Sequence, residues 1–323
     1  MIDASPFGQA LSLLRSVKTI RNAYPGSRIA VAASTGTCEL VSMTGLADRT
    51  IDLGVIKDSG RGIVESARTF FRLARKTGRE EFNLVLDFSR RPETQLLSLV
   101  GLRTRTITAR SGLPELIDLL LGRKGVMRPN AERTHSSILL QLGLSRDDSQ
   151  PLYGPSPSDS VRFEERIQRS GSRGGEPIVL MYSCDAGGPG SWAVHKFAEV
   201  ASRLANNFGA RIVAADIPSD NAFTGRIGVL LSPGAIRLQA PGAPELIAAL
   251  ARASFTITDD SGLARLAAQL GTPAIAIAGS LPSPRAENSS IHALPLTVTA
   301  DEVYSVACEM LQKDRMSSIF QRG

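Results

Sequence analysis

Short apolar segments alternate with helical patterns through both halves of the chain, and this alternation limits the possible folds more than any other feature. In the first half, apolar residues spaced as on one face of a helix occupy residues 8–24, and the breaker pair Pro25-Gly26 follows. The other predicted elements of this half are a helix at residues 63–75 and strands at 28–32, 83–88 and 104–108. Strands that alternate with helices pair in parallel, so we expect a doubly wound sheet.

The second half repeats the alternation more clearly, and the chain is long enough for two domains. Its predicted strands are residues 178–182, 211–215, 254–258 and 274–278, and its predicted helices are residues 192–207, 243–253, 263–270 and 300–312. A chain of 323 residues exceeds one ordinary hydrophobic core and fits two domains of about 150 residues each. The expected architecture is therefore α/β, with two Rossmann-like doubly wound domains facing a cleft at the carboxyl ends of their strands.

A change of composition marks the boundary between the two domains. Between residues 147 and 177, Gly, Pro and Ser gather in loops that flank one short helical pattern. The expected divisions are an N-terminal domain at residues 1–155, a linker at 156–176, a C-terminal domain at 177–299, and a last helix and tail at 300–323. We expect that last helix to pack back on the N-terminal domain.

The composition argues against several classes of protein. No apolar run approaches the roughly 20 residues that span a bilayer, and no secretory signal is recognisable at the N-terminus. The three cysteines are far apart in the sequence, and any single disulfide would leave one of them unpaired. This pattern favours a protein of the reducing cytoplasm. The three histidines, of which His135 is expected on a helix flank, show no zinc-site spacing, so we expect neither a metal nor a cofactor.

Positive charge is concentrated in the first half of the chain. Residues 1–150 hold 22 Lys and Arg against 15 Asp and Glu, a net charge of +7, whereas residues 151–323 carry −1. Such an excess of positive charge would favour binding to anionic lipid headgroups, to a phosphorylated acceptor or to nucleic acid. The alternative is a solvated, Arg-rich surface with no ligand. Only 5% of the residues are aromatic, too few for the stacking platforms of single-strand binding, so we expect no nucleic-acid partner.

The turn Asp260-Ser261-Gly262 lies between a predicted strand and a predicted helix, where an anion can bind. The first turn of a helix has unpaired N–H groups, and the macrodipole adds about half a positive charge. Gly262 allows a ligand close to the backbone, Ser261 can cap the helix or bind a phosphate, and Arg265 adds a guanidinium. The alternative is that the turn is an ordinary helix N-cap with no ligand. If it is an anion site, we expect the backbone amides of residues 261–263 to have no partner within the protein and to donate to diphosphate oxygens.

A longer pattern around this turn resembles the donor-site segment of glycosyltransferase family 9, the ADP-heptose:lipopolysaccharide heptosyltransferases and their relatives. The similar segment covers residues 244–279. The stretch from Phe7-Gly8-Gln9 to Pro25-Gly26 is similar to that family's acceptor loop and first helix, and residues 82–87 and Trp192 also fall in register. The resemblance implies a GT-B fold, in which the first domain binds the acceptor and the second binds the nucleotide-sugar.

The resemblance also implies an activity and a set of site residues. The activity is metal-independent, inverting transfer of a sugar from a nucleotide-diphospho-sugar, with ADP-heptose as the candidate donor, to a lipopolysaccharide-core or related glycan acceptor. Such an acceptor is lipid-linked at the inner membrane surface, so the implied enzyme is cytoplasmic and peripheral at that membrane; we expect a monomer. The implied donor-binding residues are Ser183, Asp185, Gly190, Pro241, Asp260, Ser261, Gly262 and Arg265.

The catalytic positions depart from the family's pattern. Inverting transfer needs a base for the acceptor hydroxyl, and the family has an aspartate directly after the glycine of its N-terminal motif. Gln9 occupies that position, and an amide cannot accept the proton. Asp3 and Asp87 are the candidate replacement bases, with Asp185 as a third. Each has a structural alternative, as a terminal, turn or solvated loop carboxylate.

Three functions are therefore open on the sequence alone. The first is a glycosyltransferase of the family 9 type. The second is a catalytically impaired relative that acts as a nucleotide-binding or scaffold protein, because Gln9 replaces the base and Gly190-Ser191 replaces the lysine that the family has before Trp192. The third is a GT-B-shaped sugar-nucleotide epimerase, which would interconvert or hydrolyse the donor without any acceptor.

Overall fold

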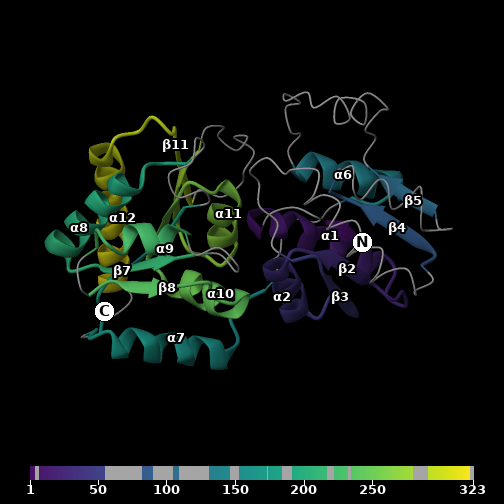
Figure 1. The fold of residues 1–323 in the computed structure, drawn as a ribbon, viewed down its shortest axis with the longest axis horizontal. Coiled ribbons are helices and arrows are strands. Elements are labelled where there is room, and N and C mark those ends of the chain that lie inside the picture. The colour runs from purple at the N-terminus through teal and green to yellow at the C-terminus, as the bar shows by residue number, and fades with distance from the viewer. Residues whose placement is uncertain are drawn as a thin grey trace. The chain divides into compact units, whose positions relative to one another are not determined.

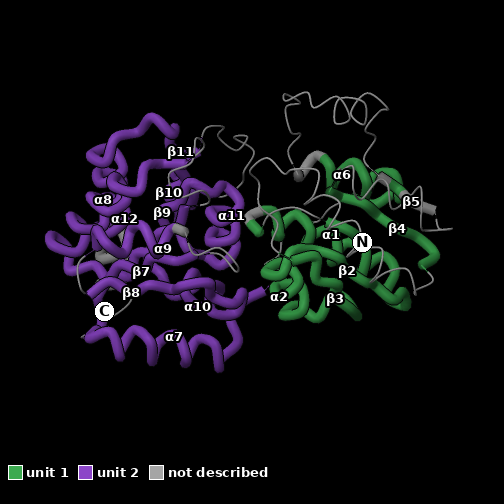
Figure 2. Tube along the Cα trace, viewed as in Figure 1, with its two compact units in different colours: residues 1–152 green, residues 153–323 purple. Residues whose placement is uncertain are grey.

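A computed structural model of the chain contains two compact units (Figure 2). Unit 1 comprises residues 1–152 and unit 2 comprises residues 153–323. The structure describes residues 1–3, 7–54, 82–89, 105–108, 131–145, 153–172, 174–183, 191–216, 222–231, 234–278 and 290–320. The helix predicted at residues 63–75 lies outside the described residues, as do Asp185 and Gly190.

Unit 1 is built on a five-stranded parallel sheet (Figure 1). In sheet order, the strands are β3 (Arg49–Asp52), β2 (Ala30–Ala33), β1 (Ile2–Asp3), β4 (Leu84–Asp87) and β5 (Arg105–Thr108). The described helices are the 3-10 turn η1 (Phe7–Gln9), α1 (Ala10–Ala23), α2 (Thr35–Thr44) and α6 (Ala131–Gln141). The short strand β1 is central, because Ile2 pairs with Ala32 on one side and with Asp87 on the other.

Hydrophobic periodicity explains the position of the helices in unit 1. Helix α1 buries Leu13, Leu14 and Val17 completely, which matches the spacing of one helix face. Helix α6 packs against α1 and buries Ile138 and Leu139 in the same way. The predicted helix at the start of the chain is thereby confirmed.

Unit 2 is built on a six-stranded parallel sheet. In sheet order, the strands are β11 (Ile291–Leu294), β10 (Ala274–Ile277), β9 (Phe255–Thr258), β6 (Ile178–Tyr182), β7 (Arg211–Ala215) and β8 (Ile236–Leu238). The described helices are α7 (Pro157–Arg169), α8 (Val194–Phe208), α9 (Ala222–Ile227), α10 (Ala243–Arg252), α11 (Ser261–Gln269) and α12 (Ala300–Phe320). Every residue of β6, β9 and β10 is buried, as expected for parallel strands covered on both faces.

Aromatic side chains organise the hydrophobic core of unit 2 beneath α8, α9 and α12. Trp192 and Phe197 meet edge to face with ring centroids 4.8 Å apart, and Phe197 meets Phe223 in the same way at 5.3 Å. All three are buried in one cluster with alternate residues of the strands. Helices α10 and α11 contact the same strands without joining this cluster, so they cover the other face of the sheet.

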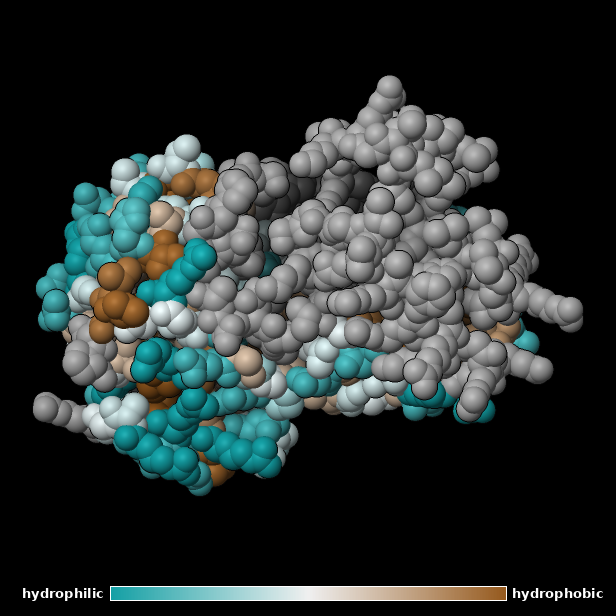
Figure 3. All heavy atoms as spheres, in the orientation of Figure 1, coloured by the Kyte–Doolittle hydropathy of each residue, from teal (hydrophilic) through white to brown (hydrophobic). Residues whose placement is uncertain are grey.

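Helix α7 belongs to unit 2, which corrects its expected place in a linker. It packs against α10 and buries Phe163 and Ile167. An ion pair of 2.5 Å joins Arg166 of α7 to Glu245 of α10. The outward face of α7, at the lower left of Figure 3, is mostly hydrophilic, as expected of a surface helix.

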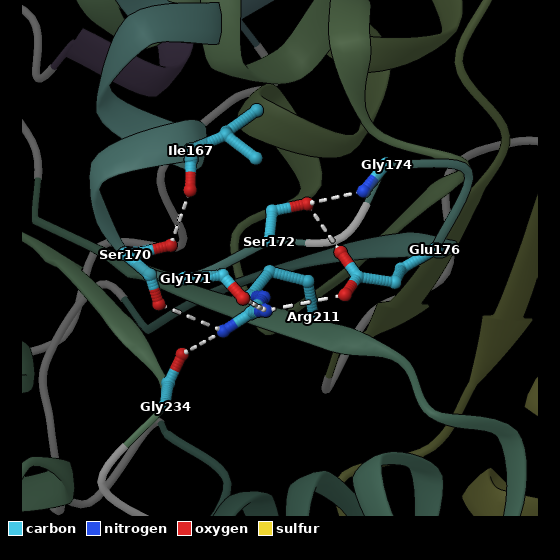
Figure 4. Close-up of polar contacts among 8 residues, drawn as sticks. All are labelled: Ile167, Ser170, Gly171, Ser172, Gly174, Glu176, Arg211 and Gly234. Atoms are coloured by element: carbon cyan, nitrogen blue, oxygen red, sulfur yellow. Dashed lines mark hydrogen bonds and ion pairs between the residues drawn. The ribbon is translucent and has the colours of Figure 1, made fainter.

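The segment that follows α7 is fixed to unit 2 by the guanidinium of Arg211, the first residue of β7 (Figure 4). Its nitrogens donate to the carbonyl oxygens of Ser170 at 3.2 Å, Gly171 at 3.1 Å and Gly234 at 2.8 Å, and pair with Glu176 at 3.3 Å. Arginine can make these contacts together because its five N–H donors form a rigid fork. One side chain therefore joins the end of α7 to β7 and to the loop before β8.

The last helix packs inside unit 2. Helix α12 begins with a capping box, in which the Thr299 amide donates to Glu302 at 2.8 Å and the Glu302 amide donates to Thr299 at 3.2 Å. The helix then packs against α8, where Arg203 pairs with Asp301 at 2.6 Å. Among the described helices, none is long and apolar enough to cross a membrane.

Candidate functional site

The sheet of unit 2 has one point at which the strand order reverses, between β6 and β9. Strands β7 and β8 extend the sheet on one side of β6, and β9, β10 and β11 extend it on the other. In open α/β sheets, ligands bind outside the carboxyl ends of the strands at such a switch point. Ser183 directly follows β6, and Asp259 and Asp260 directly follow β9, so these three polar residues lie where a ligand is expected.

Asp259 links the two strands at this switch point. Its Oδ2 accepts a 2.7 Å hydrogen bond from the Ser183 hydroxyl and a 3.0 Å hydrogen bond from the Trp192 amide. Asp259 and Ser183 are both buried. The Ser183 hydroxyl, predicted to contact the donor, therefore binds Asp259. Asp259 is not among the predicted site residues; its position directly after an apolar strand is the sequence signal that could have identified it.

The first turn of α11 differs from the expected row of bare amides. Asp260 is its N-cap, and Oδ1 accepts hydrogen bonds from the amides of Gly262 at 2.7 Å and Leu263 at 3.0 Å. Two of the three amides that were expected to receive diphosphate oxygens are thus occupied by a carboxylate of the same turn. Asp260 turns back onto its own helix because aspartate is among the strongest N-capping residues.

Two side chains of α11 remain suited to an anion next to this cap. Ser261 and Arg265 are both half-buried. Arg265 donates from Nε to the Ser261 carbonyl at 3.2 Å, which holds its guanidinium along the first turn of the helix. A guanidinium held in this way offers charge and paired donors to a phosphate.

The loop before α10 contains a backbone feature of its own. Pro241, predicted to lie near the nucleoside, is buried in the short loop between β8 and α10. The preceding residue, Ala240, has a φ of 42°, in the left-handed region that L-residues with a side chain rarely adopt. Such backbone strain costs roughly 1–3 kcal/mol and gathers at ligand sites. This loop also leaves the carboxyl end of a strand, as the switch-point residues do.

Unit 1 has a switch point of the same kind, between β1 and β4. Strands β2 and β3 lie on one side of β1, and β4 and β5 lie on the other. Asp3 ends β1 and Asp87 ends β4, so both predicted base candidates lie at the carboxyl ends of the two flanking strands. Both carboxylates are nevertheless almost fully buried, with 2% of Asp3 and 1% of Asp87 exposed.

Internal partners hold both of these carboxylates. Oδ1 of Asp87 accepts hydrogen bonds from the Ser89 amide at 3.0 Å and from the Ser89 hydroxyl at 2.5 Å, the geometry of an Asx turn. Oδ2 of Asp3 lies 3.3 Å from Nε2 of His135. Asp87 therefore matches its structural alternative, as a turn aspartate, and Asp3 faces a histidine.

His135 is fully enclosed, which corrects its expected place on a helix flank. Its Nδ1 lies 2.8 Å from the Ser16 hydroxyl of α1, and its ring stacks on Phe88 with centroids 4.3 Å apart. Only 1% of the residue is exposed. Its spacing from Ile138 and Leu139, three and four residues later, is the sequence signal that places it on the buried face of α6.

Gln9 is more open than either carboxylate. It is the last residue of η1 and precedes α1, where its side chain is half-buried and makes no capping hydrogen bond. Unit 1 therefore presents a neutral amide in the segment that leaves β1. Within the described part of the chain, no three His, Cys, Asp or Glu side chains gather closely enough to hold a metal ion.

Comparisons with known proteins agree with this arrangement. No curated protein sequence matches the chain significantly. A family 9 glycosyltransferase from Veillonella parvula is 15% identical and has a TM-score of 0.70, with 97% of this chain and 96% of the other covered. ADP-heptose lps heptosyltransferase II from E. coli is 18% identical with a TM-score of 0.60, covering 97% and 98%.

A third structure, E. coli heptosyltransferase WaaC with ADP-2-deoxy-2-fluoro heptose, is 19% identical with a TM-score of 0.61, covering 95% of this chain and 98% of the other. These likenesses give the chain the GT-B fold, with Rossmann-like units built on parallel sheets. The family model "Glycosyltransferase family 9 (heptosyltransferase)" matches residues 70–290, more than half of the chain and the whole switch point of unit 2. The chain belongs to glycosyltransferase family 9.

Proposed function

We propose that the protein transfers a sugar from a nucleotide-diphospho-sugar, with ADP-heptose as the candidate donor, to a lipopolysaccharide-core or related glycan acceptor. The observation that supports this most is the switch point of unit 2, where Ser183, Asp259 and the first turn of α11 gather inside the segment that matches the family. The reaction is inverting and metal-independent. The protein acts in the cytoplasm as a monomer, at an acceptor that is lipid-linked on the inner membrane surface.

The donor's diphosphate lies along the first turn of α11 in this proposal. Arg265 supplies positive charge, and Ser261 supplies a hydroxyl and an amide. Oδ1 of Asp260 already caps the amides of Gly262 and Leu263. Since a carboxylate repels phosphate oxygens, Asp260 contacts sugar hydroxyls of the donor in this proposal. Pro241, in the loop that follows β8, lies beside the nucleoside.

The chemistry that this arrangement supports is a single displacement. An acceptor oxygen attacks the anomeric carbon from the face opposite the diphosphate, and the bond from that carbon to the diphosphate oxygen breaks. The diphosphate leaves with the electron pair, and negative charge grows on it during the step. A preorganised guanidinium at that position stabilises the growing charge without a metal ion. Arg265 has this role.

A second candidate function is a catalytically impaired relative that binds the nucleotide or acts as a scaffold. Gln9 and the buried carboxylates of Asp3 and Asp87 favour it, since none of the three is an accessible base. The scaffold would keep unit 2 and its donor site, so binding alone does not separate the two candidates.

A donor assay separates the candidates. The full chain is incubated with ADP-heptose and with ADP-, GDP- and UDP-linked hexoses, with and without a core-glycan acceptor, and release of nucleoside diphosphate is followed. Acceptor-dependent release supports the transferase. Binding without release supports the impaired relative, and interconversion or hydrolysis of the donor without acceptor supports an epimerase.

A further inference from the structure

The register between β6 and β9 brings two polar residues together just beyond the sheet. Tyr182 and Thr258 are the last residues paired between these parallel strands. The next residues along the two strands, Ser183 and Asp259, therefore stand opposite each other, and the Ser183 hydroxyl donates to Oδ2 of Asp259 at 2.7 Å. Both residues are buried. Strand register thus sets the position of this contact.

The same oxygen of Asp259 also fixes the start of α8. It accepts the Trp192 amide at 3.0 Å, two residues before the helix begins at Val194. The Trp192 ring is anchored separately, because its Nε1 donates to the Val298 carbonyl at 3.0 Å and the ring meets Phe197 edge to face. The chain therefore leaves β6 and enters α8 at two points that share one acceptor atom.

The neighbouring residue, Asp260, is directed to α11 instead. Its carboxylate caps the first turn of that helix, and its own amide donates to the Thr258 hydroxyl at 3.0 Å. Asp259 thus binds the end of β6 and the start of α8, while Asp260 binds α11. Ser183 on one side of the proposed donor site and Arg265 on the other are joined through these two adjacent aspartates.

From these contacts we propose that Asp259 is a positioning residue of the donor site. The inference rests on the proposed function and assigns a residue outside the predicted donor-binding set. Asp259 is 6% exposed, and a carboxylate would repel a diphosphate, so its role is to give an acceptor oxygen to two donors of the protein. It acts through Ser183, whose hydroxyl it orients, and through the turn that leads into α11. A residue that holds contacting side chains in place contributes to affinity without touching the ligand.

Substitutions that keep or remove this acceptor oxygen test the proposal. Asp259→Asn and Asp259→Leu are both neutral and nearly equal in shape, but only the asparagine has an oxygen that can accept the two hydrogen bonds. Calorimetry on the full chain measures the affinity of each variant for ADP, GDP and UDP. We expect Asp259→Asn to bind the preferred diphosphate within about threefold of the unchanged protein, and Asp259→Leu to bind it about tenfold more weakly or worse.

A carboxylate at the amino end of β6 provides the matched control. Glu176 accepts from the Ser172 hydroxyl and pairs with Arg211 at 3.3 Å, at the opposite end of the strand from Ser183 (Figure 4). Glu176→Ala removes internal contacts of the same unit, so the free energy of unfolding should fall while diphosphate affinity stays unchanged. Asp259→Ala, which also lacks the acceptor oxygen, repeats the comparison if leucine does not fit.

The single tryptophan of the chain reports on the same contact without any ligand. Trp192 is buried, and an enclosed indole emits at a shorter wavelength than one in water. Asp259→Leu and Asp259→Ala should shift its emission to longer wavelength and increase its quenching by acrylamide. Asp259→Asn and Glu176→Ala should leave both properties as they are in the unchanged protein.

The outcomes separate this inference from the proposed function. Equal diphosphate affinity of Asp259→Asn and Asp259→Leu, whether high or low, would overturn the inference while donor binding stands. A loss in Glu176→Ala equal to that in Asp259→Leu would also overturn it, because the effect would then be one of general stability. An unchanged protein that binds no nucleoside diphosphate would remove the proposed function, and the donor role of Asp259 with it.

Discussion

The Ser183 hydroxyl donates a 2.7 Å hydrogen bond to Oδ2 of Asp259 and so joins the ends of β6 and β9, the two strands that flank the switch point of unit 2. The same oxygen accepts the Trp192 amide at 3.0 Å, which fixes the point where the chain enters α8. A buried carboxylate thus holds together the elements that a donor would contact.

Asp259→Ala should destabilise the protein more than an ordinary surface change does. The substitution leaves two buried donors, Ser183 Oγ and the Trp192 amide, without their acceptor, and each such loss costs roughly 1–3 kcal/mol. We expect a decrease of about 3 kcal/mol in the free energy of unfolding, measured with urea. Asp301→Ala is the control, because that side chain is 82% exposed and its ion pair is worth about 1 kcal/mol or less. Equal losses in the two variants would show that Asp259 does not have this role.

His135→Ala should be strongly destabilising, because it deletes a fully buried ring that stacks on Phe88 and lies 3.3 Å from the Asp3 carboxylate. Replacing a large buried side chain by alanine typically costs about 2–5 kcal/mol. Asp3→Asn and the double variant complete a cycle for this contact, and the two single losses should not add. A double variant whose loss equals the sum of the two single losses would contradict a direct interaction between the residues.

Much of the fold follows from the sequence because parallel strands that are buried on both faces are uniformly apolar. Strands β6 and β7 end where the pattern predicts, and β9 and β10 differ from prediction by one residue at one end. Helix α2 and strand β3 are not predicted, since α2 is rich in Thr and Ser and β3 has only one fully buried residue. Weak periodicity gives no signal there.

The site is predicted less completely than the fold. The turn after β9 is found because a strand, a polar turn and a helix follow one another in sequence. The capping of Gly262 and Leu263 by Asp260 is missed, since the sequence does not show whether an aspartate turns toward its own helix or toward a ligand. The partnership of Asp3 and His135 is missed for another reason: the residues are 132 positions apart, and only the packing of α6 brings them together.

Asp48 should make stability depend on pH at the acidic end. The Ile29 amide, and then the Arg21 guanidinium, donate to its carboxylate and hold the pKa of Asp48 below its ordinary value. A lowered pKa in the folded state stabilises the protein above the unfolded pKa, and this contribution is lost as pH falls through the folded value.

Carboxyl NMR should therefore show Asp48 titrating below an ordinary aspartate. The unfolding free energy of Asp48→Asn should change less between about pH 5 and pH 2 than that of the unchanged protein. An ordinary titration midpoint for Asp48 would contradict the assigned contacts. The effect is expected to be modest, since the pair lies at the surface and is screened by salt.

Asp260→Ala should lower the thermal stability of the protein, because α11 loses its N-cap. Caps of this kind are worth about 1 kcal/mol. Asp260→Asn is the matched variant: an asparagine caps nearly as well, so its stability should stay close to that of the unchanged protein. A drop of equal size in both variants would show that the charge of Asp260, rather than its hydrogen bonds to the helix, stabilises the turn.

The central claim is that unit 2 binds the diphosphate of a nucleotide-sugar along the first turn of α11, and calorimetric titration tests it most directly. The unchanged protein and Arg265→Ala are each titrated with ADP, GDP and UDP and with the corresponding nucleosides. We predict that at least one diphosphate binds, and that Arg265→Ala weakens it by about 1.5–3 kcal/mol while the nucleoside loses much less. No binding of any diphosphate, or equal losses for diphosphate and nucleoside, would contradict the claim.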